Sequence, residues 1–138
     1  MAISICMPRR TYAISQSIAL TDSSRPQWNP QGGIWAPDIN VVNGRYMLYY
    51  SKSEWGGEWN CGIGIASATF PQGPFIDHGA LFISQDIGIQ NCIDPFYIED
   101  HGKKYLFWGS FHGIFGAELT EDGLALKPGT KPVQVADN

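Results

Sequence analysis

Short runs of β-branched and aromatic residues recur along the chain, each bounded by Gly, Pro, Asn or Asp. Such runs are typical of β-strands, and the 3.6-residue periodicity of amphipathic helices is nearly absent. The pattern predicts strands at residues 39–42, 45–50, 63–66, 80–83, 96–98, 104–108 and 115–119. Asn43-Gly44 and His101-Gly102 each separate two of these runs, and two-residue turns of this type indicate hairpins. The chain is therefore predicted to be all-β and antiparallel.

The sequence resembles itself at an offset of 58 residues. The matched pairs are Pro37 and Pro95, Gly44 and Gly102, Arg45 and Lys103, Leu48 and Leu106, Tyr49 and Phe107, and Tyr50 and Trp108. Each copy would hold two hairpins, and a repeat that carries four strands is the signature of a β-propeller blade. A generic β-sandwich is the alternative fold.

The length of the chain limits how much of a propeller it can form. At 58 residues per blade, 138 residues hold about 2.4 blades, whereas closed propellers typically need about four to eight. We expect a partial propeller with a remnant of a first blade at 1–30, a second blade at 31–88 and a third at 89–138. Because such a wedge exposes two blade faces, we expect a fragment or half of an assembly, with self-association through these faces as one outcome.

Composition and charge exclude several classes of protein. Hydrophobic residues make up 43% of the chain and aromatic residues 13%, which is enough apolar surface to fold rather than stay disordered. The net charge of −4 and the absence of a Lys/Arg run argue against binding to nucleic acid. No stretch approaches the roughly 20 apolar residues of a membrane-spanning helix. The first residues form too short an apolar run for a secretory signal, so no signal peptide is predicted and the localisation stays open.

Cysteine and histidine spacing predicts neither a disulfide framework nor a metal site. The three cysteines are far apart and odd in number, and no histidine lies at metal-ligand spacing from them. The sequence therefore predicts no metal ion and no cofactor. Cys92 is expected to be a small buried hydrophobic residue rather than a nucleophile.

Two acidic residues are expected to occupy matching positions, at the starts of the first strands of the two repeats. Asp38 follows Trp35-Ala36-Pro37, and Asp94 precedes Pro95. Because the innermost strands of a propeller line its channel, we expect these carboxyls to open onto one funnel. Glycoside hydrolysis uses such paired carboxyls, one to protonate the leaving oxygen and one to activate water, and a Trp face covers the apolar face of a sugar. The alternative is that both Asp residues only cap turns.

These segments resemble glycoside hydrolase family 43, the five-bladed propeller arabinanases, arabinofuranosidases and β-xylosidases. The resemblance spans about residues 28–125 and rests on WAPD at 35–38, NGRYMLYYS at 43–51, IDPF at 93–96, DHGKKYL at 100–106 and WGSF at 108–111. It implies an inverting glycosidase that acts on plant polysaccharide containing arabinose or xylose. Members of the family are often secreted or periplasmic.

The resemblance implies a role for each candidate residue. The family uses an Asp on blade one as general base, a Glu on blade four as general acid, and an Asp on blade three that orients the acid and tunes its pKa. Asp94 matches the blade-three Asp. Asp38 matches a family signature acid on blade two, expected to support the site or face the substrate, and Trp35 is expected to pack near the sugar.

The resemblance supplies one of the three catalytic acids. Asp22 lies in a loop rather than at a strand entrance, and Glu118 and Glu121 fall in an outer hairpin and its turn, so none of them matches the base or the acid. We therefore expect the 138-residue chain alone to be catalytically inactive or nearly so. The alternatives are a non-catalytic carbohydrate-binding or interaction module built from blades, or a truncated product.

Two further features carry open alternatives. His112 could project toward the pocket or be an ordinary loop histidine. The loop at 54–60, with Trp55 and Trp59 among glycines, could form a wall that stacks on sugar or could simply pack on its neighbour.

Overall fold

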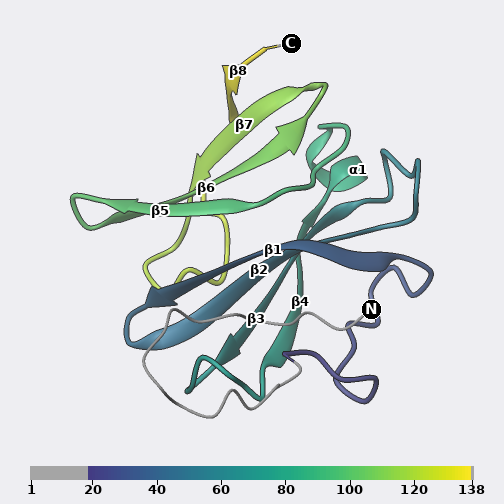
Figure 1. The fold of residues 1–138 in the computed structure, drawn as a ribbon. Coiled ribbons are helices and arrows are strands. Elements are labelled where there is room, and N and C mark those ends of the chain that lie inside the picture. The colour runs from purple at the N-terminus through teal and green to yellow at the C-terminus, as the bar shows by residue number, and fades with distance from the viewer. Residues whose placement is uncertain (1–18, 138) are drawn as a thin grey trace, which may run out of the picture.

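The computed structural model describes residues 19–137, which form two four-stranded antiparallel sheets (Figure 1). The first sheet contains β1 (Gly33–Val42), β2 (Arg45–Ser53), β3 (Gly62–Ala68) and β4 (Ile76–Ile83), in that order. The second contains β5 (Phe96–Asp100), β6 (Lys103–Ser110), β7 (Gly113–Glu118) and β8 (Val133–Ala136), also in chain order. A four-residue helix, α1 (Ser84–Ile87), lies between the sheets in sequence. The all-β prediction and the two complete blades are thus confirmed.

Both predicted hairpin turns are present. Val42 pairs with Arg45 and Asp100 pairs with Lys103, so each turn has two residues. All four turn residues have positive φ, from 47° at His101 to 76° at Gly44. A two-residue turn of type I′ requires this backbone conformation at both of its residues. The two turns therefore fix the registers of β1 against β2 and of β5 against β6.

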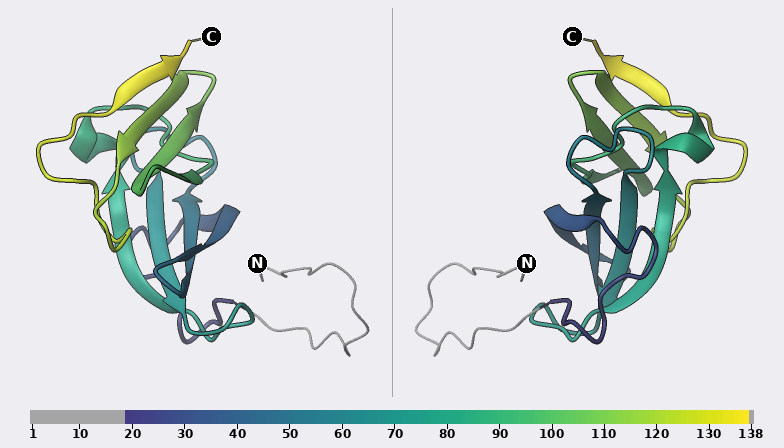
Figure 2. Two further views of the ribbon diagram at one scale, coloured as in Figure 1. Left: turned by 90° about the vertical axis from the view of Figure 1, so that its left-hand side faces the viewer. Right: turned by 90° about the vertical axis from the view of Figure 1, so that its right-hand side faces the viewer.

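The main core lies between the two sheets, which Figure 2 shows from two sides. Met47, Tyr49, Ile63, Ile65 and Phe82 of the first sheet meet an opposing set from the second: Tyr97, Leu106, Trp108 and Ala117. Two ring pairs span the contact. Tyr49 stacks on Tyr97 with centroids 5.7 Å apart, and the Phe82 and Trp108 centroids are 4.6 Å apart. Face-to-face packing of neighbouring blades is the arrangement expected of a propeller.

The strand β2 is buried on both faces because the first sheet has a second core on its other side. Leu48 and Tyr50 point away from the second sheet and pack with Ile34, Ala66, Ala68 and Phe75, and with Ala19, Leu20 and Trp28 from the preceding segment. This explains the near-continuous apolar run of β2, since adjacent side chains enter different cores. Gly64 belongs to the same packing, because a Cβ there would lie 2.1 Å from the Tyr50 ring.

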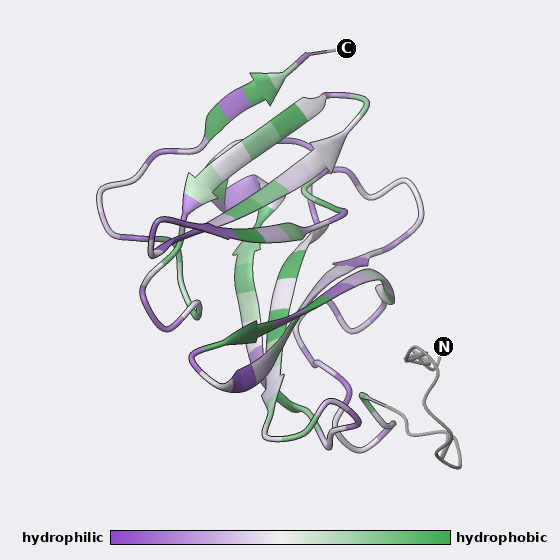
Figure 3. Ribbon diagram, turned by 60° about the vertical axis from the view of Figure 1, so that its left-hand side comes forward, coloured by the Kyte–Doolittle hydropathy of each residue, from purple (hydrophilic) through white to green (hydrophobic). Residues whose placement is uncertain are grey.

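The second sheet buries one face only. Tyr97 is buried in β5, whereas Phe96 and Ile98 on either side are 57% and 42% exposed, and Val133 and Val135 of β8 are also exposed. Figure 3, coloured by hydropathy, shows bands of hydrophobic and hydrophilic residues along the strands. The exposed face is one of the two predicted from the wedge shape. Self-association through it stays a prediction.

Two further predictions concern residues 1–30 and membrane-spanning helices. Most of the expected first-blade remnant lies outside the described residues, and residues 19–32 form turns and bends without a strand. Within 19–137, no helix is long and apolar enough to cross a membrane.

Candidate active site

Asp94 lies in the connection from α1 to β5, where its backbone is tied to both sheets. Its N–H donates to the Ser51 hydroxyl on β2 over 2.8 Å, and the preceding carbonyl of Ile93 accepts from the Gly109 N–H over 2.8 Å. Asp94 has φ 55°, in the left-handed region that L-residues other than Asn, Asp and Gly seldom adopt. Such strained backbone is held in place only when the surrounding structure determines it, and it clusters at functional sites.

The Asp94 side chain makes no hydrogen bond or ion pair with any residue from 19 to 137. Desolvation by the surrounding chain raises the pKa of its carboxyl above the ordinary 3.8. The backbone at Asp94 is thus held by hydrogen bonds, whereas the side chain is exposed and its carboxyl is not held by any described residue.

Asp38 and Asp94 are not equivalent positions, and this part of the sequence analysis is wrong by two residues. The registers of the two hairpins place Asp38 opposite Tyr49 and Phe96 opposite Phe107, so Asp38 corresponds to Phe96 and Ala36 corresponds to Asp94. Ala36 shares the positive φ of Asp94 and likewise precedes a proline. A register shift in β1 between Trp35 and Asp38 accommodates this bend.

Asp38 nevertheless reaches the start of the third blade. Its Oδ2 accepts a hydrogen bond from the backbone N–H of Tyr97 over 2.6 Å, three residues beyond Asp94. The carboxylate is therefore engaged with the backbone of β5. A shared funnel for the Asp38 and Asp94 carboxyls, as well as contact of Asp38 with substrate, stays a prediction.

Trp35 lies beside the exposed Trp55. The two ring centroids are 6.2 Å apart, and Trp55 is 93% exposed. The Trp35 Nε1 is buried and has no hydrogen-bond partner among the described residues. The pair forms an apolar surface at the loop that follows β2, which is the chemistry that the sugar-stacking alternative for residues 54–60 requires.

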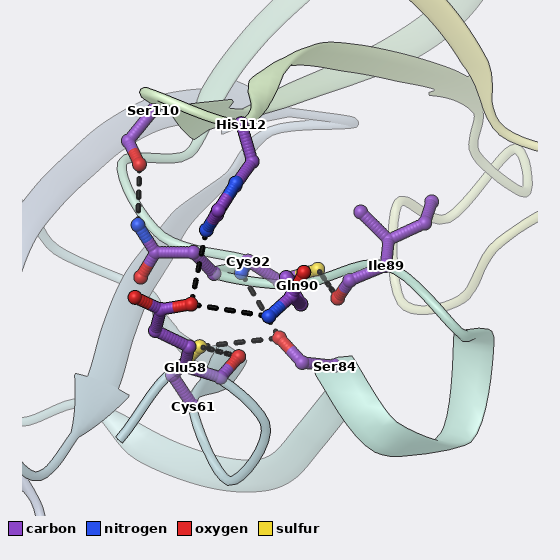
Figure 4. Close-up of polar contacts among 9 residues, drawn as sticks. Glu58, Cys61, Ser84, Ile89, Gln90, Cys92, Ser110 and His112 are labelled. Atoms are coloured by element: carbon purple, nitrogen blue, oxygen red, sulfur yellow. Dashed lines mark hydrogen bonds and ion pairs between the residues drawn. The ribbon is translucent and has the colours of Figure 1, made fainter. Parts of the chain in front are cut away.

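The rest of that loop packs on its neighbour, so both alternatives for it find support. Glu58 joins the loop to the third blade, as Figure 4 shows: its Oε2 is 2.9 Å from His112 Nε2 and accepts from Gln90 Nε2 over 3.1 Å. Its backbone carbonyl accepts from the Asn91 N–H over 2.8 Å. His112 therefore lies at the same end of the blades as the connection that carries Asp94, but no hydrogen bond or ion pair joins the two within 19–137. The sequence analysis did not single out Glu58.

A buried polar network holds the connection just before Asp94. The Ser84 hydroxyl accepts from the Cys92 N–H over 3.0 Å and lies 3.1 Å from the Cys61 sulfur. Cys92 and Cys61 are free and fully buried, and burial raises the pKa of the Cys92 thiol to about 11. A thiol with so high a pKa is a poor nucleophile at neutral pH, in agreement with the interpretation of Cys92 as a small buried residue.

Glu118 is poorly suited as a proton donor, and residues 19–137 hold no candidate metal cluster. Glu118 pairs with Lys127, and this bond holds the pKa of the Glu118 carboxyl below its ordinary value, as suits a fixed anion rather than a proton donor. Between residues 19 and 137, no group of three or more His, Cys, Asp or Glu side chains could hold a metal ion.

The sequence is similar to a known protein family and to known proteins along most of its length. The model of the glycosyl hydrolases family 43 matches residues 15–137. The chain belongs to this family. It is 38% identical over 122 residues to a probable arabinan endo-1,5-alpha-L-arabinosidase C of Aspergillus clavatus, covering 86% of this chain and 38% of that protein. It is also 38% identical over 94 residues to the arabinan endo-1,5-alpha-L-arabinosidase A of Aspergillus niger, covering 67% and 29%.

Solved structures of this family confirm the partial propeller. The alpha-L-arabinanase of Cellvibrio cellulosa matches with a TM-score of 0.73 and 28% identity, covering 83% of this chain and 41% of that one. An exo-1,5-alpha-L-arabinanase from a bovine ruminal metagenomic library matches with a TM-score of 0.67 and 32% identity, covering 80% and 40%. The family 43 chain described here thus spans about two-fifths of the length of these relatives.

The raised pKa of Asp94 predicts a pH-dependent effect on stability. Because its folded pKa lies above the ordinary 3.8, the ionised carboxylate destabilises the fold at neutral pH, and this cost disappears as the pH falls through the folded pKa toward 3.8. We expect Asp94→Asn to raise the melting temperature at pH 7, since Asn also tolerates positive φ, and to leave it unchanged below pH 3.8. Thermal melts across this range test it, with Asp86→Asn on α1 as control. A lower melting temperature at pH 7 for Asp94→Asn alone would contradict the assigned cause.

Proposed function

We propose that this chain forms blades two and three of an inverting, arabinan-hydrolysing glycosidase and supplies Asp94 as the acid that orients and tunes the general acid. The observation that best supports this proposal is the environment of Asp94. Its backbone is held by both sheets, whereas its carboxyl has no hydrogen-bond or ion-pair partner among the described residues. Membership of the family and the arabinanase relatives support arabinan as substrate. Substrates containing xylose are the alternative within the family.

In a complete active site, this chain would supply Asp94, and other blades would supply the general base and the general acid. An inverting glycosidase needs a base that takes a proton from water and an acid that protonates the leaving oxygen, about 6.5–9.5 Å apart. An ionised Asp94 close to that acid would raise the acid's pKa by charge repulsion and keep it protonated at neutral pH. Asp94 therefore transfers no proton itself. The base and the acid are to be supplied by blades that this chain does not contain.

Other residues at this end of the blades are proposed to bind the sugar. Trp35 and Trp55 offer an apolar surface for the face of an arabinofuranose ring, and the 93% exposure of Trp55 leaves that surface accessible. His112, held by Glu58, would present its ring to the substrate from the loop between β6 and β7. The same exposed surface favours the second candidate, a carbohydrate-binding module without catalysis.

An exchange enzyme separates the two candidates. In it, residues 33–137 of this chain replace the matching blades of the Cellvibrio cellulosa alpha-L-arabinanase, which provides the remaining blades. If this chain supplies working second and third blades, the folded exchange enzyme hydrolyses debranched arabinan. A folded exchange enzyme that binds arabino-oligosaccharides but does not cleave them would support the binding module instead.

A further inference from the structure

The hydrogen bond between Ser51 and Asp94 crosses from one blade to the next. Ser51 lies on β2, opposite Trp35, and is completely buried. Its hydroxyl accepts from the Asp94 N–H over 2.8 Å, although the two residues are 43 positions apart in the sequence. The backbone of Asp94 therefore depends on a side chain of the neighbouring blade.

Another hydrogen bond holds the chain next to Asp94, because the Gly109 N–H donates to the Ile93 carbonyl. Pro95, the next residue, has no N–H to donate, and the backbone of Asp94 is in the left-handed region at φ 55°. Without the Ser51 hydroxyl, the Asp94 N–H would lose its acceptor and the strained φ could relax. A relaxed φ would turn the Cα–Cβ bond and move the carboxyl.

A second hydrogen bond ties the same segment to the same blade. Asp38 accepts from the Tyr97 N–H over 2.6 Å, so the first sheet holds the chain at Asp94 and again three residues later. Ser51 and Asp38 come from the paired strands β1 and β2, which a two-residue turn keeps in register. Both anchor points therefore belong to a single hairpin, on either side of the register shift between Trp35 and Asp38.

We propose that Ser51, assisted by Asp38, is a positioning residue that places the Asp94 carboxyl of blade three from blade two. This inference rests on the proposed function of Asp94 in catalysis. Ser51 touches neither the substrate nor the proton that moves. Its hydroxyl joins the two blades and, through the same hydrogen bond to the Asp94 N–H, sets the position of the Asp94 carboxyl.

The first test uses the 138-residue chain itself and needs no activity. Ser51→Ala is compared with Ser53→Ala. Ser53 is another buried serine on β2, and its hydroxyl makes no hydrogen bond with a described residue. In Ser51→Ala we expect the Asp94 amide to exchange with solvent about tenfold faster, as the loss of one hydrogen bond implies. We also expect the pKa of the Asp94 carboxyl, followed by NMR, to fall toward its ordinary value because water gains access. Ser53→Ala should change neither.

Circular dichroism first establishes that both variants are folded. If Ser51→Ala is folded and its Asp94 amide exchanges as slowly as in the unsubstituted chain, the proposal is overturned. If Ser51→Ala does not fold, the unsubstituted chain decides: an Asp94 amide that exchanges as fast as those of the exposed turns would overturn the proposal, and a protected one would support it.

The second test measures kinetics in the exchange enzyme. A carboxyl displaced by about an ångström costs up to about 100-fold in rate, so Ser51→Ala should lower kcat about 10- to 100-fold with little change in KM. Ser53→Ala should keep the original kcat. Asp94→Asn serves as the reference. If Asp94→Asn leaves kcat unchanged, the proposed function fails. If Asp94→Asn lowers kcat but Ser51→Ala keeps the original kcat, as Ser53→Ala does, only the positioning role fails.

Discussion

Asp94→Asn in the exchange enzyme is expected to lower kcat by up to about 10²- to 10⁴-fold, because the general acid that it supports contributes a factor of that size. Asparagine has nearly the same size as aspartate and tolerates the φ of 55°, so the backbone and its bond to Ser51 should persist. What disappears is the negative charge. Without it the general acid loses the repulsion that keeps it protonated, so the pKa of the alkaline limb of the pH–rate profile, which reports the general acid, should fall.

The control for this substitution is Asp86→Asn, which removes the same charge from an exposed position on α1. Steady-state rates on debranched arabinan, measured across pH, should be unchanged in this variant. Equal rates for the Asp94→Asn and Asp86→Asn enzymes would show that Asp94 has no role in the reaction.

Local turn chemistry made much of the fold predictable from the sequence. Asn43-Gly44 and His101-Gly102 supply the positive φ values that two-residue turns need, and each turn fixes the register of the two strands beside it. Because this information is contained within a few residues, it could be read without the structure. The same holds for the 58-residue repeat, which follows from two blades with the same turn and the same inner strands.

The equivalence of Asp38 and Asp94 was mispredicted because the two motifs look alike but differ in register. Both contain Asp and Pro, yet Pro37 precedes Asp38 whereas Pro95 follows Asp94. Counting from the hairpin turns pairs Ala36 with Asp94, and the shared positive φ of these two residues confirms this pairing. The 58-residue offset already contained this signal, since it aligns Pro37 with Pro95.

The contacts between blades could not be read from the sequence. Ser51 and Glu58 meet their partners on the third blade only because the sheets pack face to face around Tyr49, Tyr97 and Trp108. Neither residue has a sequence neighbour that reveals its partner, 43 residues away for Ser51 and 54 for Glu58. Such contacts depend on the packing of whole sheets, which local patterns do not encode.

The isolated 138-residue chain is expected to be inert as a glycosidase. Asp94 is the one of the family's three catalytic acids that its sequence matches, and Asp94 is proposed to support an acid rather than to donate or accept a proton. Lacking both the base and the acid should cost more than the 10²- to 10⁴-fold of a single missing partner. Self-association would duplicate Asp94 without supplying either group.

The claim that the general base and general acid lie outside this chain is tested most directly by one rate. This is the rate at which the purified chain releases reducing ends from debranched arabinan, measured beside its own Asp94→Asn variant. Aryl arabinofuranoside and aryl xyloside extend the assay to the substrates of related enzymes. We predict the same background rate for both proteins on all three substrates. Turnover by the unsubstituted chain well above that of Asp94→Asn would contradict this claim, because it would show that a complete pair of catalytic base and acid is present within these two blades.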